Sequence, residues 1–266
     1  MIILKSVAEL EAMRQSSRVV ARVLSELEPL VRPGIRTRDL DLYADKRTRE
    51  LGAVPAFKGY RGYPASVCVS VNEEIIHGIP SGRILQEGDI VSLDFGALYE
   101  GFFSDSALTV PVGRVSAEAR KLIGAAERAF DKGLEQLREG NRVSDISAAI
   151  QRSVESEGFS VIRQFVGHGI GRALHEEPQI PNFGVPGHGP KIRRGMTLAI
   201  EPMIAMGGWE VEVQEDGWTA VTRDRTLAAH FEHTVALTEN GPEILSARPA
   251  EAGARRPALL KESPHA

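Results

Sequence analysis

The chain of 266 residues has little cysteine, no long hydrophobic run and no large excess of charge of either sign. Its single cysteine, Cys68, cannot form a disulfide within the chain, which is typical of a reducing compartment. The N-terminal MIILKSVAEL has an apolar run of four residues, too short for a signal peptide, and no run approaches a membrane span. We therefore expect a cytoplasmic protein that does not bind or cross a membrane.

The charge balance argues against a further class of partner. The formal net charge is −4 at pH 7, and the Lys and Arg residues form no basic cluster. We therefore expect no nucleic-acid binding. A hydrophobic content of 42% and a charged content of 26% are ordinary for a globular protein, and the length fits one large domain or two small ones.

Hydrophobic periodicity predicts pairs of helices that alternate with strands. Ser6 and Glu9 have the spacing of a capping box, before an amphipathic helix that ends near Pro29. Thr37 is predicted to cap a second helix that stops at Gly52. Later helices are predicted at 116–137 and 144–157, and strands at 66–71, 87–109 (a hairpin), 159–166, 197–203, 211–213, 219–222 and 229–238.

The order helix, helix, strand and hairpin occurs twice, and turn residues recur at a nearly constant offset. Gly34, Arg36, Asp39, Leu40 and Gly52 recur 106 positions later as Gly140, Arg142, Asp145, Ile146 and Gly158, and Gly88 and Asp94 recur 107 later as Gly195 and Glu201. Chance is the alternative, because Gly, Asp and Arg are common at caps and turns. We favour a duplicated half, with two sheets joined about a pseudo-twofold axis.

The repeat suggests how the chain divides. We expect a single domain over residues 1–247, with internal halves of about 1–113 and 114–247. The remaining tail, 248–266 (RPAEAGARRPALLKESPHA), is rich in Pro, Ala and charge, and this composition predicts disorder.

Two aspartates in the hairpin EGDIVSLDFGALYEGFFSDSALT (87–109) carry the first chemical signal. Asp94 lies within an apolar strand pattern, and Asp105 follows 105 − 94 = 11 residues later. Across a hairpin this separation can bring both carboxylates to one point, where they repel unless a cation lies between them. A bound metal is one interpretation. The alternative is an exposed aspartate at a strand end and another in a turn.

The second half of the chain supplies three more candidate ligands. His168 lies in VGHGIG, Glu201 in TLAIEPM and Glu232 in HFEHTVAL. Each alone is more typical of a capped loop histidine or a strand-end acid than of a metal ligand. With Asp94 and Asp105 they make four carboxylates and one imidazole, a set too rich in oxygen for a structural zinc site. Four negative charges balance two divalent ions, and shared carboxylates can bridge a metal pair that activates water.

Two further histidines stand close to these candidates in sequence. His77 lies in NEEIIHGIP, and His175 in GIGRALHEEP. A neutral imidazole beside a metal centre can hydrogen-bond a scissile amide or a developing oxyanion. The alternative for either residue is an ordinary core or loop histidine.

On these motifs the chain closely resembles type I methionine aminopeptidase in its short bacterial form. The resemblance covers about residues 3–247 and rests on GYPASVCVSVNEEIIHGIP, DFGALYEGFFSDSALT, GHGIGRALHEEP, TLAIEPM, and DGWT followed by FEHTVALT. It implies a mixed α/β (α+β) protein with the pita-bread fold. In that fold, two helix-helix-strand-hairpin halves related by a pseudo-twofold axis surround a central curved antiparallel sheet.

The resemblance also implies a role for individual residues. Its five metal ligands fall on Asp94, Asp105, His168, Glu201 and Glu232, with Asp105 and Glu232 bridging. Glu201 would take a proton from a water between the metals, His175 would stabilise the oxyanion and His77 would contact the scissile amide. The methionine pocket falls on Tyr60, Tyr63, Cys68, Leu174 and Trp218.

The implied function is hydrolytic removal of the initiator methionine from nascent proteins whose second residue is small. It implies two divalent ions, and an oxygen-rich site accepts cobalt, manganese, iron or zinc. We expect a monomer that meets nascent N-termini at the ribosome. The alternatives are an X-Pro aminopeptidase or prolidase of the same fold, and a metal-free binding module. An additional N-terminal domain is usual in the former, and all five ligand positions are filled, which disfavours the latter.

Two positions depart from the family pattern. Leu174 stands where many members have an aromatic residue, and Arg61 stands where many have histidine. Both lie beside the expected pocket, so they bear on its shape and on its preference for the second residue, but not on the chemistry.

Overall fold

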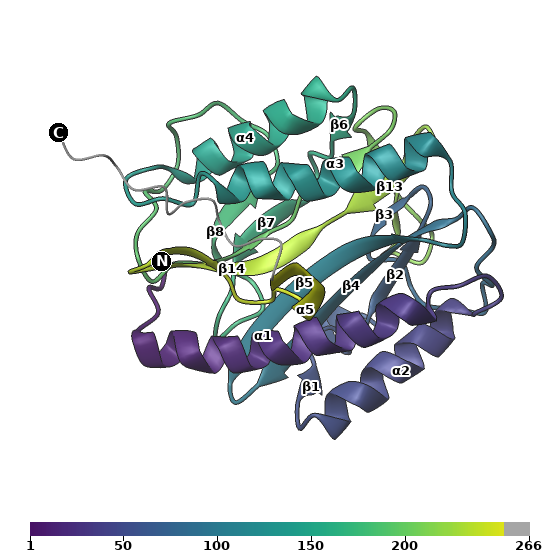
Figure 1. Ribbon diagram of the computed structural model, residues 1–266, viewed down its shortest axis with the longest axis horizontal. Helices are drawn as coiled ribbons and strands as arrows, with labels where there is room; N and C mark the ends of the chain where they lie inside the picture. The colour runs from purple at the N-terminus through teal and green to yellow at the C-terminus, as the bar shows by residue number, and fades with distance from the viewer. Residues whose placement is uncertain (253–266) are drawn as a thin grey trace.

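The computed structural model describes residues 1–252 and places them around a curved antiparallel sheet of nine strands (Figure 1). Seven of the strands follow the order β1-β4-β5-β14-β9-β7-β8, with β2 paired to β4 and β15 paired to β14. Their bounds are β1 (Val54–Pro55), β2 (Cys68–Val71), β4 (Ile90–Tyr99), β5 (Phe102–Pro111), β7 (Val166–Gly169), β8 (Glu176–Pro181), β9 (Thr197–Ile200), β14 (Glu232–Thr238) and β15 (Gly241–Ile244).

Two helix pairs flank this sheet. The pairs are α1 (Val7–Leu27) with α2 (Thr37–Glu50), and α3 (Ala117–Leu134) with α4 (Val143–Ser156). In Figure 1 the first pair runs along the half of the sheet that holds β4 and β5, and the second along the half that holds β7 and β8. Across residues 1–252, no helix combines the length and the apolar character that crossing a membrane requires.

The helix boundaries follow from local chemistry. Ser6 caps α1: its hydroxyl accepts a hydrogen bond from the Glu9 N–H, and the Glu9 carboxylate accepts one from the Ser6 N–H. The helix gives way to a 3₁₀ turn (Glu28–Leu30) that contains Pro29. Both predictions are confirmed, whereas the third helix ends at Leu134, three residues before the predicted end at 137.

The duplication is confirmed by matching backbone detail. Helices α2 and α4 each have 14 residues and begin 143 − 37 = 106 positions apart. An isolated antiparallel bridge joins Arg36 to Ile84 in the first half, and another joins Arg142 to Lys191 in the second. Gly34 and Gly140 precede these helices with φ of 91° and 94°, a conformation that favours glycine. The chain therefore consists of two equivalent halves.

Each half has its own apolar core between its helices and the sheet. In the first, Leu24, Leu40 and Phe95 are fully buried. In the second, Phe130 packs edge-to-face against Phe231, with ring centroids 5.4 Å apart. Burial of each such side chain stabilises the fold by about 1.5–3 kcal/mol. Two rigid half-cores therefore hold the strands that meet between them.

Three predicted strands are interrupted, and two of the interruptions lie beside candidate ligands. The predicted strand 197–203 stops at Ile200 and resumes as β10 (Met203–Ala205), because Pro202 has no N–H to donate to a ladder. The strand predicted at 229–238 is likewise divided into β13 (Ala228–His230) and β14. The strand predicted at 159–166 is divided into β6 (Ser160–Val161) and β7.

The separated pieces β13, β10 and β6 build one small sheet, in that order. A second small sheet joins β11 (Val211–Val213), β12 (Ala220–Thr222) and β3 (Glu74–Ile76). The chain thus passes from the large sheet to a small one at Glu201. It passes between the same two sheets at Phe231, directly before Glu232. Both crossing points lie at acids that the sequence marks as candidate ligands.

The packed chain extends past the expected boundary at residue 247. A short helix, α5 (Pro249–Ala252), follows β15, and the Arg248 and Glu251 side chains are buried. Glu251 Oε2 lies 3.4 Å from Nε2 of His233, on the far side of β14 from the neighbouring Glu232. The expected tail is therefore too long by at least 252 − 247 = 5 residues. Its remainder, 253–266, lies outside the described residues.

Candidate metal centre and substrate pocket

The hairpin of β4 and β5 places Asp94 and Asp105 on one face. Asp94 pairs with Ala107, two positions from Asp105, and Asp105 pairs with Gly96. Diagonal partners of this kind project to the same side of a sheet. Both carboxylates are buried, with exposed fractions of 7% and 4%. The hairpin geometry that the 11-residue spacing predicts is therefore present.

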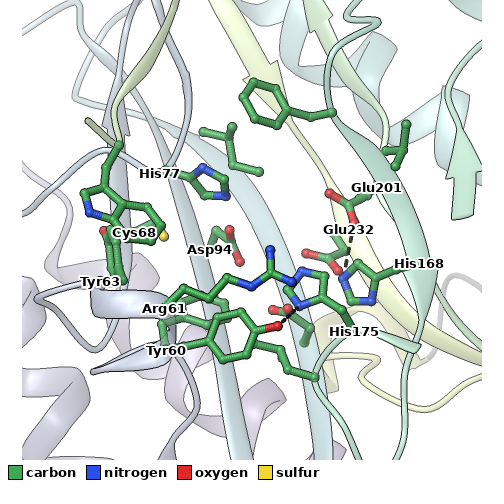
Figure 2. Close-up of a pocket in the computed structure, with 17 residues that line it drawn as sticks. Tyr60, Arg61, Tyr63, Cys68, His77, Asp94, His168, His175, Glu201 and Glu232 are labelled. Atoms are coloured by element: carbon green, nitrogen blue, oxygen red, sulfur yellow. Dashed lines mark hydrogen bonds and ion pairs between the residues drawn. The ribbon is translucent and has the colours of Figure 1, made fainter. Parts of the chain in front are cut away.

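The second half brings His168, Glu201 and Glu232 to the same place (Figure 2). Nε2 of His168 lies 3.5 Å from Oε1 of Glu201. One donor atom from each of Asp105, His168 and Glu232 lies within 4.8 Å of the other two. Asp105 and Glu232 lie on the adjacent strands β5 and β14, and His168 lies on β7. Glu201 directly follows β9, the strand between β14 and β7. The pseudo-twofold arrangement thus joins acids from both halves.

The electrostatics of this cluster are those of a cation site. Burial raises the pKa of Asp94, Glu201 and Glu232 well above its usual range, and raises that of Asp105 to about 7. One carboxylate oxygen each of Asp94, Asp105 and Glu232 is buried with no hydrogen-bond partner. These oxygen atoms accept no hydrogen bond, and their carboxyl groups resist ionisation when buried alone. A divalent metal ion would bind the oxygen atoms and supply the positive charge that stabilises the ionised carboxylates.

His168 is prepared to bind such an ion. Burial, and next the charge of His175, lower its pKa to about 3, so the imidazole is neutral at pH 7. Its Nδ1 lies 2.9 Å from the carbonyl oxygen of Gly169, which makes Nδ1 the donor. Nε2 then has a free lone pair that faces Glu201. A ring whose tautomer is set in this way is typical of a metal ligand.

An apolar pocket lies against the carboxylates. All five residues expected to form it line it: Tyr60, Tyr63, Cys68, Leu174 and Trp218. Tyr63 donates its hydroxyl proton to the carbonyl of Gly78 at 2.9 Å and meets the Trp218 ring edge-on at 5.2 Å. Burial raises the pKa of the Cys68 thiol, so it acts as a small apolar wall.

Two histidines face this pocket as predicted. His175 Nδ1 lies 2.9 Å from the Tyr60 hydroxyl, and the two rings stack with centroids 5.3 Å apart. Burial, followed by the charge of Arg61, lowers the His175 pKa. Burial lowers the pKa of His77 to about 4, and its ring packs edge-on against Phe165. Both imidazoles are therefore neutral at pH 7.

Some residues of the site were not identified from the sequence. Phe165 lines the pocket, but its position in an apolar run resembles that of any strand residue. His230 is 1% exposed, and its Nε2 lies 3.9 Å from Glu201 Oε2 and 4.0 Å from Glu232 Oε2. The sequence offered one signal: His230 stands two positions before Glu232, which is the spacing of residues on one face of a strand. The chain nevertheless changes sheets at Phe231, between the two residues.

Comparison with known proteins gives concordant matches. The model of metallopeptidase family M24 matches residues 11–239. A methionine aminopeptidase of Clostridium acetobutylicum is 51% identical over 247 residues, which cover 92% of this chain and 99% of the relative. The crystal structure of methionine aminopeptidase from Thermotoga maritima has a TM-score of 0.92 at 47% identity, and covers 93% of this chain and 100% of that chain.

A second group of structures is similar in fold alone. The prolidase from Pyrococcus furiosus has a TM-score of 0.76 at 22% identity, over 92% of this chain and 65% of the prolidase. The matched part of the prolidase is therefore about two thirds of its length.

Proposed function

The chain belongs to metallopeptidase family M24, and we propose that it removes the N-terminal methionine from polypeptides as a metal-dependent aminopeptidase. The observation that carries this proposal is the convergence of four buried carboxylates and one neutral imidazole beside an apolar pocket. The pocket's apolar walls suit the unbranched thioether side chain of methionine. Full burial of such a side chain is worth about 1.5–3 kcal/mol.

The ligand set supports two divalent ions rather than one. The residues that would hold them are Asp94, Asp105, His168, Glu201 and Glu232. When bound, the ions would polarise the scissile carbonyl and acidify a water molecule. Cobalt, manganese, iron and zinc all suit this donor set.

The protein's own groups perform the proton transfers. The buried Glu201 carboxylate, which would be ionised when the ions are bound, would accept the proton of the attacking water. The Tyr60 hydroxyl lies 2.9 Å from Nδ1 of His175. With the hydroxyl as the donor, the ring proton lies on Nε2, where it would stabilise the oxyanion. His77, neutral and held by Phe165, hydrogen-bonds the scissile amide. A free α-amino group of the substrate is attracted to the acidic floor, which restricts cleavage to the N-terminal residue.

The biological setting completes the proposal. The substrates are N-termini of nascent polypeptides with a small second residue, met at the ribosome in the cytoplasm. The enzyme acts as a monomer with one catalytic domain, whose halves are about 1–113 and 114–247.

Release of free methionine from Met-Ala-Ser by purified, metal-reconstituted protein tests the activity. We expect turnover with added divalent metal and none after chelation. An X-Pro peptide, Ala-Pro-Ala, serves as the control for the prolidase alternative. Cleavage of Ala-Pro-Ala without cleavage of Met-Ala-Ser would assign the chain to that other activity.

A further inference from the structure

A strained turn directs one charged side chain into the pocket. Between Gly59 and Tyr63 the backbone turns sharply, and the Gly59 N–H donates to the Tyr63 carbonyl at 2.8 Å. Arg61 lies at the tip with φ of 49°, a left-handed conformation that costs a non-glycine residue about 1 kcal/mol or more. Gly62 beside it also has positive φ, at 91°. Glycine would suit position 61 better, so the side chain itself merits an explanation.

The Arg61 guanidinium has a defined place. Its Cζ lies 5.4 Å from the centre of the Tyr60 ring, and its positive charge contributes to the lowered pKa of His175. Figure 2 shows the guanidinium beside His175, where it reaches over the pocket. Among the residues that line the pocket, Arg61 is the one Lys or Arg, and no carboxylate within residues 1–252 forms an ion pair with it. The side chain is exposed, which places it at the pocket's mouth.

The pocket is therefore electrically polarised. Carboxylates form its floor, and a cation stands at its mouth. A peptide's positive α-amino group is attracted to the floor and repelled by Arg61, so the chain enters amine first. The residues that follow the scissile bond then lie at the mouth, beside the guanidinium. A planar guanidinium binds carboxylates in preference to other groups.

We infer that Arg61 is a specificity residue that binds a substrate carboxylate downstream of the scissile bond. The carboxylate belongs either to an acidic side chain at the third residue or to the C-terminus of a short peptide. This inference depends on the proposed aminopeptidase activity for the direction in which the peptide lies. The effect is modest, because an exposed ion pair contributes little and is screened by salt.

Four peptides separate the two sources of carboxylate. Met-Ala-Asp amide against Met-Ala-Asn amide tests the side chain, and Met-Ala-Ser against Met-Ala-Ser amide tests the C-terminus. We expect kcat/KM at low ionic strength to be roughly two- to five-fold higher for the acidic member of at least one pair. Arg61→Gln should remove the preference, and 0.5 M salt should weaken it.

Lys58→Gln is the matched control, because Lys58 lies in the same loop but pairs with Asp45 and does not line the pocket. That variant should keep the preference. Equal kcat/KM within both pairs, or a preference that survives in Arg61→Gln, would overturn the inference. If no peptide is cleaved, the proposed function fails instead. In that case, calorimetry measures the Kd of the four peptides for the unmodified protein and for Arg61→Gln. We expect the unmodified protein to bind the acidic member of at least one pair roughly two- to five-fold more tightly, and Arg61→Gln to bind both members equally.

Discussion

At the scale of single residues, Asp105 has the most central position in the metal centre. Its carboxylate lies within reach of both His168 and Glu232, and one of its oxygens has no hydrogen-bond partner. Asp105→Asn keeps the shape but removes the charge. We predict loss of at least one bound metal per chain and a residual activity below about 1%, since metal catalysis is worth several kcal/mol.

Metal content measured by atomic absorption, together with methionine release, checks this prediction. Glu215→Gln is the control, because Glu215 is exposed and does not line the pocket. Its metal content and turnover should equal those of the unmodified protein. Full turnover of Asp105→Asn in metal-buffered solution would contradict a shared bridging ligand.

His175 is expected to act on the transition state rather than on the bound substrate. Removing one oxyanion donor typically costs 10²-fold or more in kcat, so His175→Ala should lower kcat by about that factor. KM should change little, because ground-state binding depends on the apolar pocket. Metal content should stay the same, because His175 is not a proposed ligand.

Tyr60→Phe tests how His175 is oriented. It removes the hydroxyl that lies 2.9 Å from His175 Nδ1 but keeps the stacked ring. We predict a fall in kcat of about 3- to 10-fold, the value of one neutral hydrogen bond. Steady-state kinetics on Met-Ala-Ser measures kcat and KM for both variants.

An unchanged kcat in His175→Ala would contradict the proposed role of His175 and identify it as an ordinary loop histidine.

At the scale of elements, the N-terminal segment secures the loop that carries His175. Lys5 Nζ lies 2.6 Å from Glu176 Oε2, and both side chains are buried, with exposed fractions of 1% and 8%. The other oxygen of Glu176 accepts the Arg172 N–H at 2.8 Å. A side chain at Gly171 would collide with Lys5, since a Cβ there would lie 2.3 Å from Lys5 Cε. Lys5, Gly171 and Glu176 therefore form one packed unit.

Lys5→Met should destabilise the protein strongly, because it leaves the Glu176 carboxylate buried without a counter-charge. Breaking a buried pair on one side costs about 3–5 kcal/mol. Adding Glu176→Gln to this variant removes the unpaired buried charge and should restore much of the lost free energy of unfolding. Urea unfolding measures both free energies of unfolding, with Lys46→Met as the control, because the Lys46 side chain on α2 is exposed. Equal stabilities for the single and the double variant would show that the charge is not the cause.

The elements also show what sequence patterns can and cannot predict. The capping box of α1 and the shared face of Asp94 and Asp105 follow from local spacing, so they were predictable. Thr37 is the first residue of α2 rather than its cap, and no side chain caps that helix. Pro202 was a signal for the break before Met203. The break before Glu232 had none, because an apolar run has the same pattern whether or not it changes sheets. The Lys5–Glu176 contact spans 171 positions, and a lysine and a glutamate in sequence specify no such pairing.

At the scale of the whole molecule, the pita-bread fold expected from the resemblance is the one observed. The two halves meet at the metal centre: Asp94 and Asp105 come from the first, and His168, Glu201 and Glu232 from the second. The nearly constant offset makes Asp94 and Glu201 equivalent positions of the two halves, 107 residues apart. The packing of α5 against His233 escaped prediction, because a four-residue helix has too few residues to show periodicity.

The site makes the stability of the whole molecule depend on metal and on pH together. In the metal-free protein, burial raises the pKa of Asp94, Asp105, Glu201 and Glu232 above the ordinary values of 3.8 and 4.5. Between about pH 4 and pH 7 these four carboxyl groups therefore hold more protons in the folded state than in the unfolded state. Their contribution to stability falls as pH rises through this range, whereas burial lowers the pKa of His77, His168 and His230, so these histidines contribute in the opposite direction. Divalent ions stabilise the ionised carboxylates and offset this loss.

We therefore predict that metal raises Tm more at pH 7.5 than at pH 5, by a difference above about 4 °C, which corresponds to roughly 1 kcal/mol or more at this chain length. Calorimetric scans of chelated and metal-loaded protein at both pH values measure it. Asp105→Asn should narrow the difference, because one of the four carboxylates can no longer ionise. A rise in Tm on metal binding that is equal at both pH values would contradict this, because it would show that the buried acids ionise readily without a cation.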